Sequence, residues 1–297
     1  MFHDSVFKPR LLVTGASGFL GAHLCRASGG QFLVHGTYFS RLSAASQIPL
    51  AQCDLTSFDR TSTLIDRAEP EVIIHCAAMS SPDECEAKPN QARKIIVDAT
   101  RYLCQLCELK GIRLVFISTD LVFDGTGSPY NEEDPVSALN TYGKLKAEAE
   151  ALVQSCPDSL VIRLPLLFGN RFGTANSFLQ KWIEFLGSSQ KIKAFIDEFR
   201  TPVSGERAAK GILHFLNGPE GILHLGGAER ISRYEMALKV AEIFGFDESL
   251  VEASSQKDVI TPAFRPSDVS LDSSKAFASG FDPGTFTDEL QKIKLQY

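Results

Sequence analysis

The sequence has no acidic residue between Asp4 and Asp54, although acidic side chains outnumber basic ones over the whole chain, 36 to 30, giving a formal net charge of −6. The acid-free stretch does contain basic residues: Lys8, Arg10, Arg26 and Arg41. The overall acidic balance excludes a broad nucleic-acid-binding surface, which needs a basic field. The local lack of acid leaves room for a phosphate site near the N-terminus.

Long apolar runs are also missing. No run approaches the ~18 residues of a membrane helix, and the first apolar stretch, after Arg10, is interrupted at Thr14 and Gly15, so it lacks a signal-peptide core. The seven cysteines are an odd number without the spacing of a disulfide scaffold. We therefore expect a cytoplasmic protein with reduced thiols and neither membrane nor nucleic-acid partners. Cys104 and Cys107 follow a helical pattern and are predicted to be helix residues rather than a redox or metal pair.

The first half of the sequence alternates strand-like apolar runs with stretches of helical spacing. The predicted strands are residues 10–14, 32–38, 71–77, 113–118 and 160–164. Continuous apolar strands separated by helices are typical of a parallel sheet covered on both faces. The sequence therefore predicts an α/β protein with a doubly wound, Rossmann-type sheet.

After about residue 165 this alternation changes. A Gly/Asn-rich stretch, 169–176, predicts a loop, and it is followed by predicted helices at 177–186, 204–216 and 232–244 and a strand at 221–225. Ser232 precedes Glu235 by three residues, the spacing of a capping box at a helix start. At ~150 residues per domain, we expect a nucleotide-binding domain over 1–165 and a smaller α/β substrate-binding region over 166–297, with some segments returning to the first sheet.

A glycine-rich loop joins the first predicted strand to the first helix. Gly15, Gly18 and Gly21 suit a tight turn, close approach of the backbone to a pyrophosphate, and close helix–strand packing. Backbone amides at the helix start then receive the phosphates. The intervening loop residues expected beside the coenzyme are Ser17, Phe19 and Leu20. The spacing Gly-x-x-Gly-x-x-Gly resembles the extended short-chain dehydrogenase/reductase family.

The second predicted strand lacks the acid that would hold the ribose 2′-hydroxyl of NAD. Ser40 and Arg41 follow it instead, so NADP(H) is the expected coenzyme, with NAD(H) as the alternative. The family resemblance places Asp54 and Leu55 near the adenine. The small residues after His75 let a ribose approach the sheet edge, and they are Cys76, Ala77 and Ala78; His75 itself is expected to be a buried or capping imidazole.

Tyr142 and Lys146 are four residues apart at the start of a predicted helix and so project from one face. An ammonium beside a phenol stabilises the phenolate, so we expect a lowered Tyr142 pKa. Ser118 and Thr119 end a predicted strand, where open α/β sheets bind ligands. Either hydroxyl is able to donate to a substrate carbonyl.

With these motifs the chain resembles the dTDP-4-dehydrorhamnose reductase branch of the family. The resemblance rests on Cys76–Glu86, Ser118–Gly125, Pro129–Asp134, Asn140–Lys146, Arg200–Pro202 and Arg265–Pro266. It implies reduction of the C4 ketone of a nucleotide-linked deoxysugar, with Tyr142 as proton donor, Lys146 as its partner on the nicotinamide ribose and Thr119 holding the carbonyl. It also implies coenzyme contacts by Ser118, substrate contacts by Thr119 and Asp120, a homodimer, and a Mg²⁺ ion at a subunit contact.

Two positions separate related activities. Nucleotide-sugar 4,6-dehydratases carry Asp-Glu after the Thr, whereas this chain has Asp120-Leu121, and Leu cannot transfer protons, so dehydration is disfavoured. A nucleotide-sugar epimerase stays open because it uses the same Tyr and Lys. Ile96 stands where the family usually has an Asn that supports the proton relay. That change favours the second reading, ahead of the epimerase: a coenzyme-binding regulatory subunit similar to the beta subunit of methionine adenosyltransferase.

A nucleotide diphosphate substrate needs cations from the second half of the chain. The candidates are Arg163, Arg200, Arg207 and Arg265. Arginine is favoured because it makes bidentate contacts with phosphate. Of these, Arg200 and Arg265 are the predicted substrate contacts.

Overall fold

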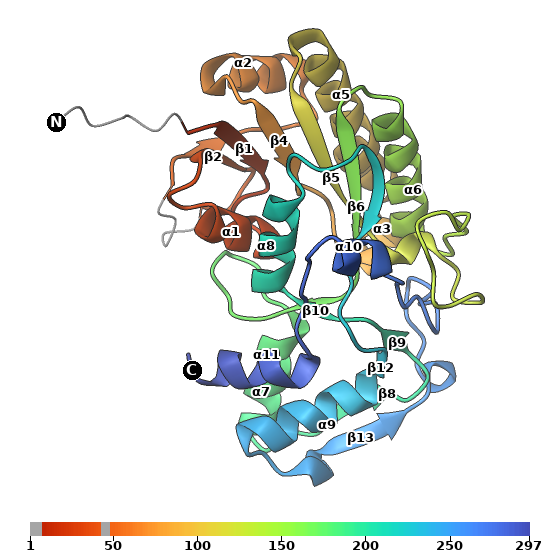
Figure 1. Cartoon of the computed structure of the whole chain (residues 1–297). Coiled ribbons are helices and arrows are strands. Elements are labelled where there is room, and N and C mark those ends of the chain that lie inside the picture. Colours follow the sequence, from red (N-terminus) through yellow and green to blue (C-terminus); the bar gives the residue numbers. More distant parts are fainter. Residues whose placement is uncertain (1–7, 43–47) are drawn as a thin grey trace, which may run out of the picture.

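The computed structural model of the chain describes residues 8–42 and 48–297 (Figure 1). Its centre is a seven-stranded sheet in which all neighbouring strands are parallel. In sheet order the strands are β11 (Gly221–His224), β6 (Ser159–Leu164), β5 (Arg113–Thr119), β4 (Val72–His75), β1 (Arg10–Thr14), β2 (Leu33–Tyr38) and β3 (Leu50–Gln52). The order reverses between β1 and β4, which is the ligand-binding edge of doubly wound sheets.

Helices cover both faces of this sheet because alternate strand residues point to opposite sides. Leu11 and Val13 pack toward α1 (Phe19–Ala27) and α8 (Gly205–His214). Leu12, between them, packs toward the other face. That face is covered by α2 (Phe58–Ala68), α5 (Ala99–Lys110) and α6 (Thr141–Gln154). The predicted doubly wound α/β fold is confirmed.

A series of short helices leads from β4 into α5. It consists of α3 (Pro82–Ala87), α4 (Pro89–Arg93) and one turn of π-helix, Lys94–Asp98. The helix then ends at Gly111, which adopts φ 65°. Cys104 and Cys107 both lie on α5, and Cys107 is buried, so the predicted helical role is confirmed. The π-helical turn contains Ile96 and was not predicted.

The second region lies below the large sheet in Figure 1 and has its own apolar core. It is built from the parallel pair β8 (Ile192–Phe195) and β13 (Val251–Ser254), with α7 (Phe178–Gly187), α9 (Arg233–Phe244) and α11 (Phe286–Lys294). Ser232 forms the predicted capping box with Glu235 at the start of α9. The remaining elements are β7 (Leu167–Phe168), β9 (Phe199–Arg200), β10 (Val203–Ser204), β12 (Ile231–Ser232), α10 (Ser274–Ala278) and three short 3₁₀ turns, Asp120–Val122, Glu248–Leu250 and Gln256–Asp258.

The chain passes between the two regions more than once. β11 and α8 come after residue 165, yet β11 pairs with β6 and α8 packs against α1 (Figure 1). The predicted strand 71–77 is shorter than expected because the backbone N–H of Ala77 donates to the Thr14 hydroxyl (3.2 Å) instead of continuing the ladder. Within residues 8–42 and 48–297, no helix has the length and apolar character to cross a membrane.

Candidate active site

The glycine-rich loop provides a cradle between β1 and α1. Gly15 adopts φ +66°, and a Cβ there would lie 2.9 Å from Ala77 Cα, so only glycine fits both the conformation and the space. Gly18 is the N-cap of α1, and because glycine has no side chain it cannot cap the first helical amides. Those amides are therefore available to an anion. Gly21 lies in the first turn of α1, directly over the Gly15 carbonyl. The loop therefore fits a dinucleotide pyrophosphate.

Replacing Gly15 by Ala is expected to destabilise the protein by about 1–3 kcal/mol, from strain at positive φ, and to weaken NADPH binding at least about tenfold. The matched control is Gly30→Ala, because Gly30 also has positive φ (+90°) but a Cβ there would meet nothing within 4 Å. Urea unfolding and a fluorescence titration with NADPH measure the two effects. Equal NADPH affinity in the two variants would contradict a pyrophosphate-binding role of the Gly15 loop.

The predicted loop 169–176 packs directly against the glycine-rich loop, which the sequence did not indicate. Thr174 donates to the Ser17 carbonyl from both its backbone N–H (2.8 Å) and its hydroxyl (3.0 Å). Phe19 packs against His23, with ring centroids 4.9 Å apart, and the Leu20 side chain lies in the core. Phosphate contacts by these two residues would therefore come from their backbone amides.

The residues expected around the adenosine lie along the same edge of the sheet. Ser40 and Arg41 follow β2 and are exposed. Asp54 is half-buried and its Oδ1 accepts from the Thr56 hydroxyl (2.7 Å), while Leu55 is buried. Arg41 is thus an exposed cation just beyond β2, where the predicted contact with the 2′-phosphate of NADP(H) needs one.

The segment after β4 is held close to β1. His75 is buried, and its Nδ1 lies 2.7 Å from the Thr14 hydroxyl, so it has the structural role that was expected. Burial lowers the His75 pKa to about 3, which keeps the imidazole neutral. The residues that follow it are half-buried at the sheet edge: Cys76, Ala77 and Ala78.

Tyr142 meets Thr119 because α6 begins unusually close to the end of β5. The Asn140 side chain caps α6 by accepting from the Gly143 N–H (2.8 Å). A Cβ on Gly143 would lie 2.0 Å from the Leu121 carbonyl oxygen, so a larger residue would push the helix away. In this arrangement the Tyr142 phenol lies near the Thr119 hydroxyl.

The expected lowering of the Tyr142 pKa is wrong for the chain without bound ligands. Burial raises the pKa of the phenol, and the nearby Asp120 carboxylate raises it further, while the neighbouring Thr119 hydroxyl opposes both. Lys146 is itself buried, and this lowers its pKa to about 7. Its Nζ donates to the Ile117 carbonyl and lies 3.9 Å from the centre of the Phe116 ring. Burial is therefore the largest cause of the pKa shift of each group.

The two hydroxyls at the end of β5 point in different directions, as successive strand residues do. Ser118 is buried and donates to the Glu150 carboxylate, whereas Thr119 lies beside Tyr142. Thr119, not Ser118, is therefore placed to meet a substrate carbonyl. A coenzyme contact from Ser118 would have to come from its backbone.

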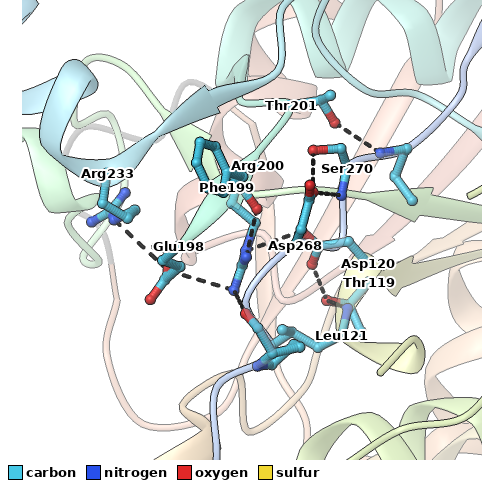
Figure 2. A network of polar contacts seen from close by, with 12 residues as sticks. Thr119, Asp120, Leu121, Glu198, Phe199, Arg200, Thr201, Arg233, Asp268 and Ser270 are labelled. Atoms are coloured by element: carbon cyan, nitrogen blue, oxygen red, sulfur yellow. Dashed lines mark hydrogen bonds and ion pairs between the residues drawn. The ribbon is translucent and has the colours of Figure 1, made fainter. Parts of the chain in front are cut away.

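Asp120 continues the edge beyond Thr119. It is buried, its Oδ1 accepts from the Thr119 hydroxyl (3.1 Å), and its Oδ2 has no hydrogen-bond partner. The closest cation is Arg200, whose Nε lies 3.7 Å from Oδ2 (Figure 2). Burial raises the Asp120 pKa to about 6, with Arg200 opposing the rise.

Three of the four predicted phosphate-binding arginines are engaged elsewhere. Arg163 is buried in an ion pair with Glu150 (2.7 Å). Arg207 pairs with Glu289 (3.0 Å). The prediction for Arg200 is corrected as well, because its side chain is only 5% exposed and its guanidinium donates to three backbone carbonyls.

Arg265 is the predicted cation that does line a cavity. The cavity has a volume of about 240 Å³ and is lined by Trp182, Lys193, Ala194, Phe195, Glu198, Arg233, Thr261 and Arg265. Arg265 Nη2 also pairs with Asp83 Oδ2 (2.9 Å). Arg233, which the sequence analysis missed, stacks on Phe178 and Trp182 with its Cζ 4.2 and 4.7 Å from the ring centres. Its one sequence signal is its place directly after the capping Ser232.

Within the described ranges, no group of three or more His, Cys, Asp or Glu side chains is arranged to hold a metal ion. The groups that gather at the sheet edge are a phenol, an ammonium, a threonine hydroxyl and a carboxylate. Together they suit proton transfer to a carbonyl oxygen.

Comparisons with known proteins agree with this geometry. The family model described as "RmlD substrate binding domain" matches residues 9–296. The "Probable low-salt glycan biosynthesis reductase Agl14" of Haloferax volcanii is 31% identical, with 96% of this chain and 97% of that protein covered. "Methionine adenosyltransferase 2 subunit beta" of Rattus norvegicus is also 31% identical, over 93% and 84% of the two chains.

Solved structures share the whole fold. A "hypothetical dTDP-4-dehydrorhamnose reductase" from Sulfolobus tokodaii has a TM-score of 0.83 and 35% identity, and the match covers 93% of this chain and 98% of that one. The Bacillus anthracis dTDP-4-dehydrorhamnose reductase, solved in complex with NADP, has a TM-score of 0.85 at 22% identity, covering 98% and 100%. The chain therefore belongs to the RmlD family, an extended short-chain dehydrogenase/reductase family whose solved members include dTDP-4-dehydrorhamnose reductases.

Proposed function

We propose that this chain reduces the C4 ketone of a nucleotide-linked deoxysugar with NADPH. The observation that carries the proposal is that the Tyr142 phenol and the Thr119 hydroxyl lie close together at the carboxyl end of β5. It places a proton donor and a carbonyl-holding hydroxyl on the edge of the sheet that also carries the glycine-rich loop. The reductase names of Agl14 and of the S. tokodaii structure support the same reaction class.

The raised pKa of Tyr142 suits a reductase, because a proton donor must still hold its proton at neutral pH. Bound NADPH supplies the hydride to the carbonyl carbon. The Thr119 hydroxyl donates to Asp120 in the chain without ligands; with substrate bound it turns its one hydrogen to the carbonyl oxygen and orients it. Tyr142 transfers its phenolic proton to that oxygen. The phenolate left on Tyr142 is then stabilised by the ammonium of Lys146, one helical turn further along α6.

The cavity beside Arg265 is the proposed site for the nucleotide diphosphate. Arg233, Arg265 and Lys193 supply positive charge, and arginine guanidinium groups suit bidentate phosphate contacts. Trp182 and Phe195 offer ring faces for stacking. In this proposal the residues before about 165, joined by α8 and β11, hold the coenzyme, and the remaining residues after 165 shape the substrate pocket.

The direct test mixes the protein with NADPH and dTDP-4-dehydrorhamnose and follows the absorbance of the reduced nicotinamide. Oxidation that needs the sugar nucleotide is the expected result. No turnover by the wild-type protein, while NADPH still binds, would contradict the reductase proposal.

NADPH is the proposed coenzyme rather than NADH because β2 is followed by Arg41 and not by an acid. Arg41→Ala is expected to weaken NADPH binding about tenfold, as expected for the loss of one charge-assisted phosphate contact, and to leave NADH binding within about twofold. Arg67→Ala, at an exposed arginine in the last turn of α2, is the matched control. Fluorescence titrations with both nucleotides measure the difference, and tighter binding of NADH than NADPH by the wild-type protein would refute the preference.

A coenzyme-binding regulatory subunit is the second candidate function. Ile96 is 1% exposed in the π-helical turn and offers no hydrogen bond to a proton relay, and the beta subunit of methionine adenosyltransferase is a relative of the whole chain. Retained NADPH binding without turnover on a panel of 4-keto-sugar nucleotides would favour this function. A nucleotide-sugar epimerase would instead convert its substrate without net oxidation of NADPH.

The predicted homodimer and cytoplasmic location rest on the sequence and the family resemblance. Light scattering of the purified full chain at micromolar concentration tests the dimer directly. A mass of 32.5 kDa would identify a monomer.

A further inference from the structure

Four charged side chains of alternating sign, three of them buried and Arg233 half-buried, connect the cavity with the catalytic edge (Figure 2). Arg233 lies on the cavity, and its Nε is 3.9 Å from Glu198 Oε1. The same oxygen lies 3.5 Å from Arg200 Nη2, and Arg200 Nε lies 3.7 Å from Asp120 Oδ2. Asp120 Oδ1 in turn accepts from the Thr119 hydroxyl. The path therefore runs without interruption from the cavity to the threonine that meets Tyr142.

Among these four side chains, Arg200 is held in place by hydrogen bonds to the backbone. Its guanidinium donates to the carbonyl oxygens of Phe199 (2.6 Å), Pro266 (3.1 Å) and Ser267 (3.4 Å). These carbonyls come from β9 itself and from the segment after Arg265, so the charge is held from two sides. With its side chain 5% exposed, Arg200 cannot turn toward a phosphate in the cavity. A buried charge held in this way acts on its neighbours rather than on solvent.

The local fold explains why these charges meet. β9 pairs antiparallel with β12, with Arg200 opposite Ile231, and α9 begins with Arg233 directly after β12. The backbone N–H of Arg233 donates to the Glu198 carbonyl (2.9 Å), which ties the start of α9 to the start of β9. One small strand pair therefore fixes both arginines on either side of Glu198.

We propose that Arg200 is a positioning residue that holds the carboxylate of Asp120 beneath Thr119 and couples it, through Glu198, to the cation on the nucleotide cavity. The functional part of this inference rests on the proposed function, in which Thr119 and Tyr142 act on the substrate carbonyl. An ionised Asp120 is only an acceptor for the Thr119 hydroxyl, whereas a protonated Asp120 also carries an O–H that can donate to the threonine oxygen, so protonation changes how the threonine is oriented. Loss of the Arg200 charge would therefore disturb the threonine without removing any group that touches substrate.

The charges around Asp120 allow a test that depends only on the direction in which the Asp120 pKa shifts. The groups that face its carboxyl are Arg200, Glu198 and the phenol of Tyr142. Arg200 lowers the Asp120 pKa and Glu198 raises it. Removing the charge of Arg200 must therefore raise this pKa, and removing the charge of Glu198 must lower it. A merely structural role of the two side chains gives no reason for opposite shifts.

The test is a titration of the Asp120 carboxyl carbon by ¹³C NMR on the full chain, with the signal assigned through Asp120→Asn. Arg200→Gln is expected to raise the titration midpoint by about one pH unit or more. Glu198→Gln is expected to lower it. Arg200→Lys, which keeps the charge, should leave the midpoint within about half a unit of wild type. Unchanged midpoints, or shifts in the same direction in both charge-removing variants, would overturn the proposal.

Kinetics supply the second readout. In Arg200→Gln, kcat at pH 7 is expected to fall about twofold or more with KM for the sugar nucleotide within about twofold, and raising the pH should recover the loss as Asp120 ionises. Arg200→Lys should recover most of it. If Arg200→Gln does not fold, Glu198→Gln still tests the direction of the Asp120 pKa shift. Arg200→Lys still tests whether a positive charge at this position is enough to keep the wild-type kcat. If the wild-type protein shows no turnover, the proposed function fails, whereas the NMR titration still decides the coupling.

Discussion

Replacing Tyr142 by Phe is expected to lower kcat for ketone reduction at least about 100-fold, the usual contribution of a positioned proton donor. NADPH affinity should stay within about twofold, because only the phenolic oxygen is removed. That oxygen lies near Thr119 and carries the proton that the reduced carbonyl oxygen must receive. Stopped-flow measurement of NADPH oxidation at saturating sugar nucleotide gives the chemical step directly.

Tyr102→Phe is the matched control for this experiment. Tyr102 lies on α5 on the same side of the sheet and packs edge-on against Phe58, with ring centroids 5.6 Å apart. It has no part in the proposed chemistry, so its variant should keep wild-type turnover. Unchanged turnover in Tyr142→Phe would mean that another group supplies the proton.

Replacing Lys146 by Met is expected to lower kcat/KM at least about 100-fold, since the ammonium stabilises the developing phenolate in a site from which water is excluded. Lys146 is 3% exposed and lies over the Phe116 ring. Lys144→Met is the control, because Lys144 lies on the same helix but is exposed. Comparable losses in the two variants would show that the effect is not specific to the buried ammonium.

The same substitution has a stability effect with a defined pH dependence. The Lys146 pKa is about 7 in the folded chain and 10.5 in the unfolded chain. Between these values the unfolded chain binds a proton that the folded chain does not, so this group makes the folded state more stable as the pH rises. The free energy of unfolding of wild type relative to Lys146→Met should therefore increase from pH 7 to pH 9, by on the order of 1 kcal/mol per pH unit. Urea unfolding at several pH values measures it, and a flat difference would contradict the lowered pKa.

The sequence was sufficient for the fold and for the chemistry-bearing motifs. Apolar strands separated by helices predicted the parallel sheet, because burial on both faces leaves no polar alternation. The Gly15 turn could be predicted from the sequence because it needs a conformation that only glycine adopts easily. The placement of Tyr142 and Lys146 on one helix face could be predicted from their spacing of four residues.

The roles of neighbouring residues required the three-dimensional structure. Ser118 and Thr119 are adjacent and chemically similar, yet one contacts Glu150 and the other Tyr142. The pKa of Tyr142 could not be predicted from its spacing to Lys146, because burial has the larger effect. Arg200 looked like a surface cation for phosphate, and only the packing of β9 reveals that it is buried.

The cavity was the least predictable part of the site. Its cations, Lys193, Arg233 and Arg265, come from separate stretches of the second half of the chain. No spacing rule connects them, because β8, α9 and the segment before Arg265 meet only in the folded chain. The sequence found Arg265 through its Arg-Pro turn but had no comparable signal for Arg233.

The most direct test of the proposed function follows the hydride itself. The full chain is incubated with NADPH deuterated at nicotinamide C4 and with dTDP-4-dehydrorhamnose, and the sugar product is analysed by NMR. We expect deuterium from one face of the nicotinamide at sugar C4, in a single configuration, with the hydroxyl proton exchanging with water. Absence of deuterium at sugar C4, with the ketone unchanged and NADPH still bound, would contradict it.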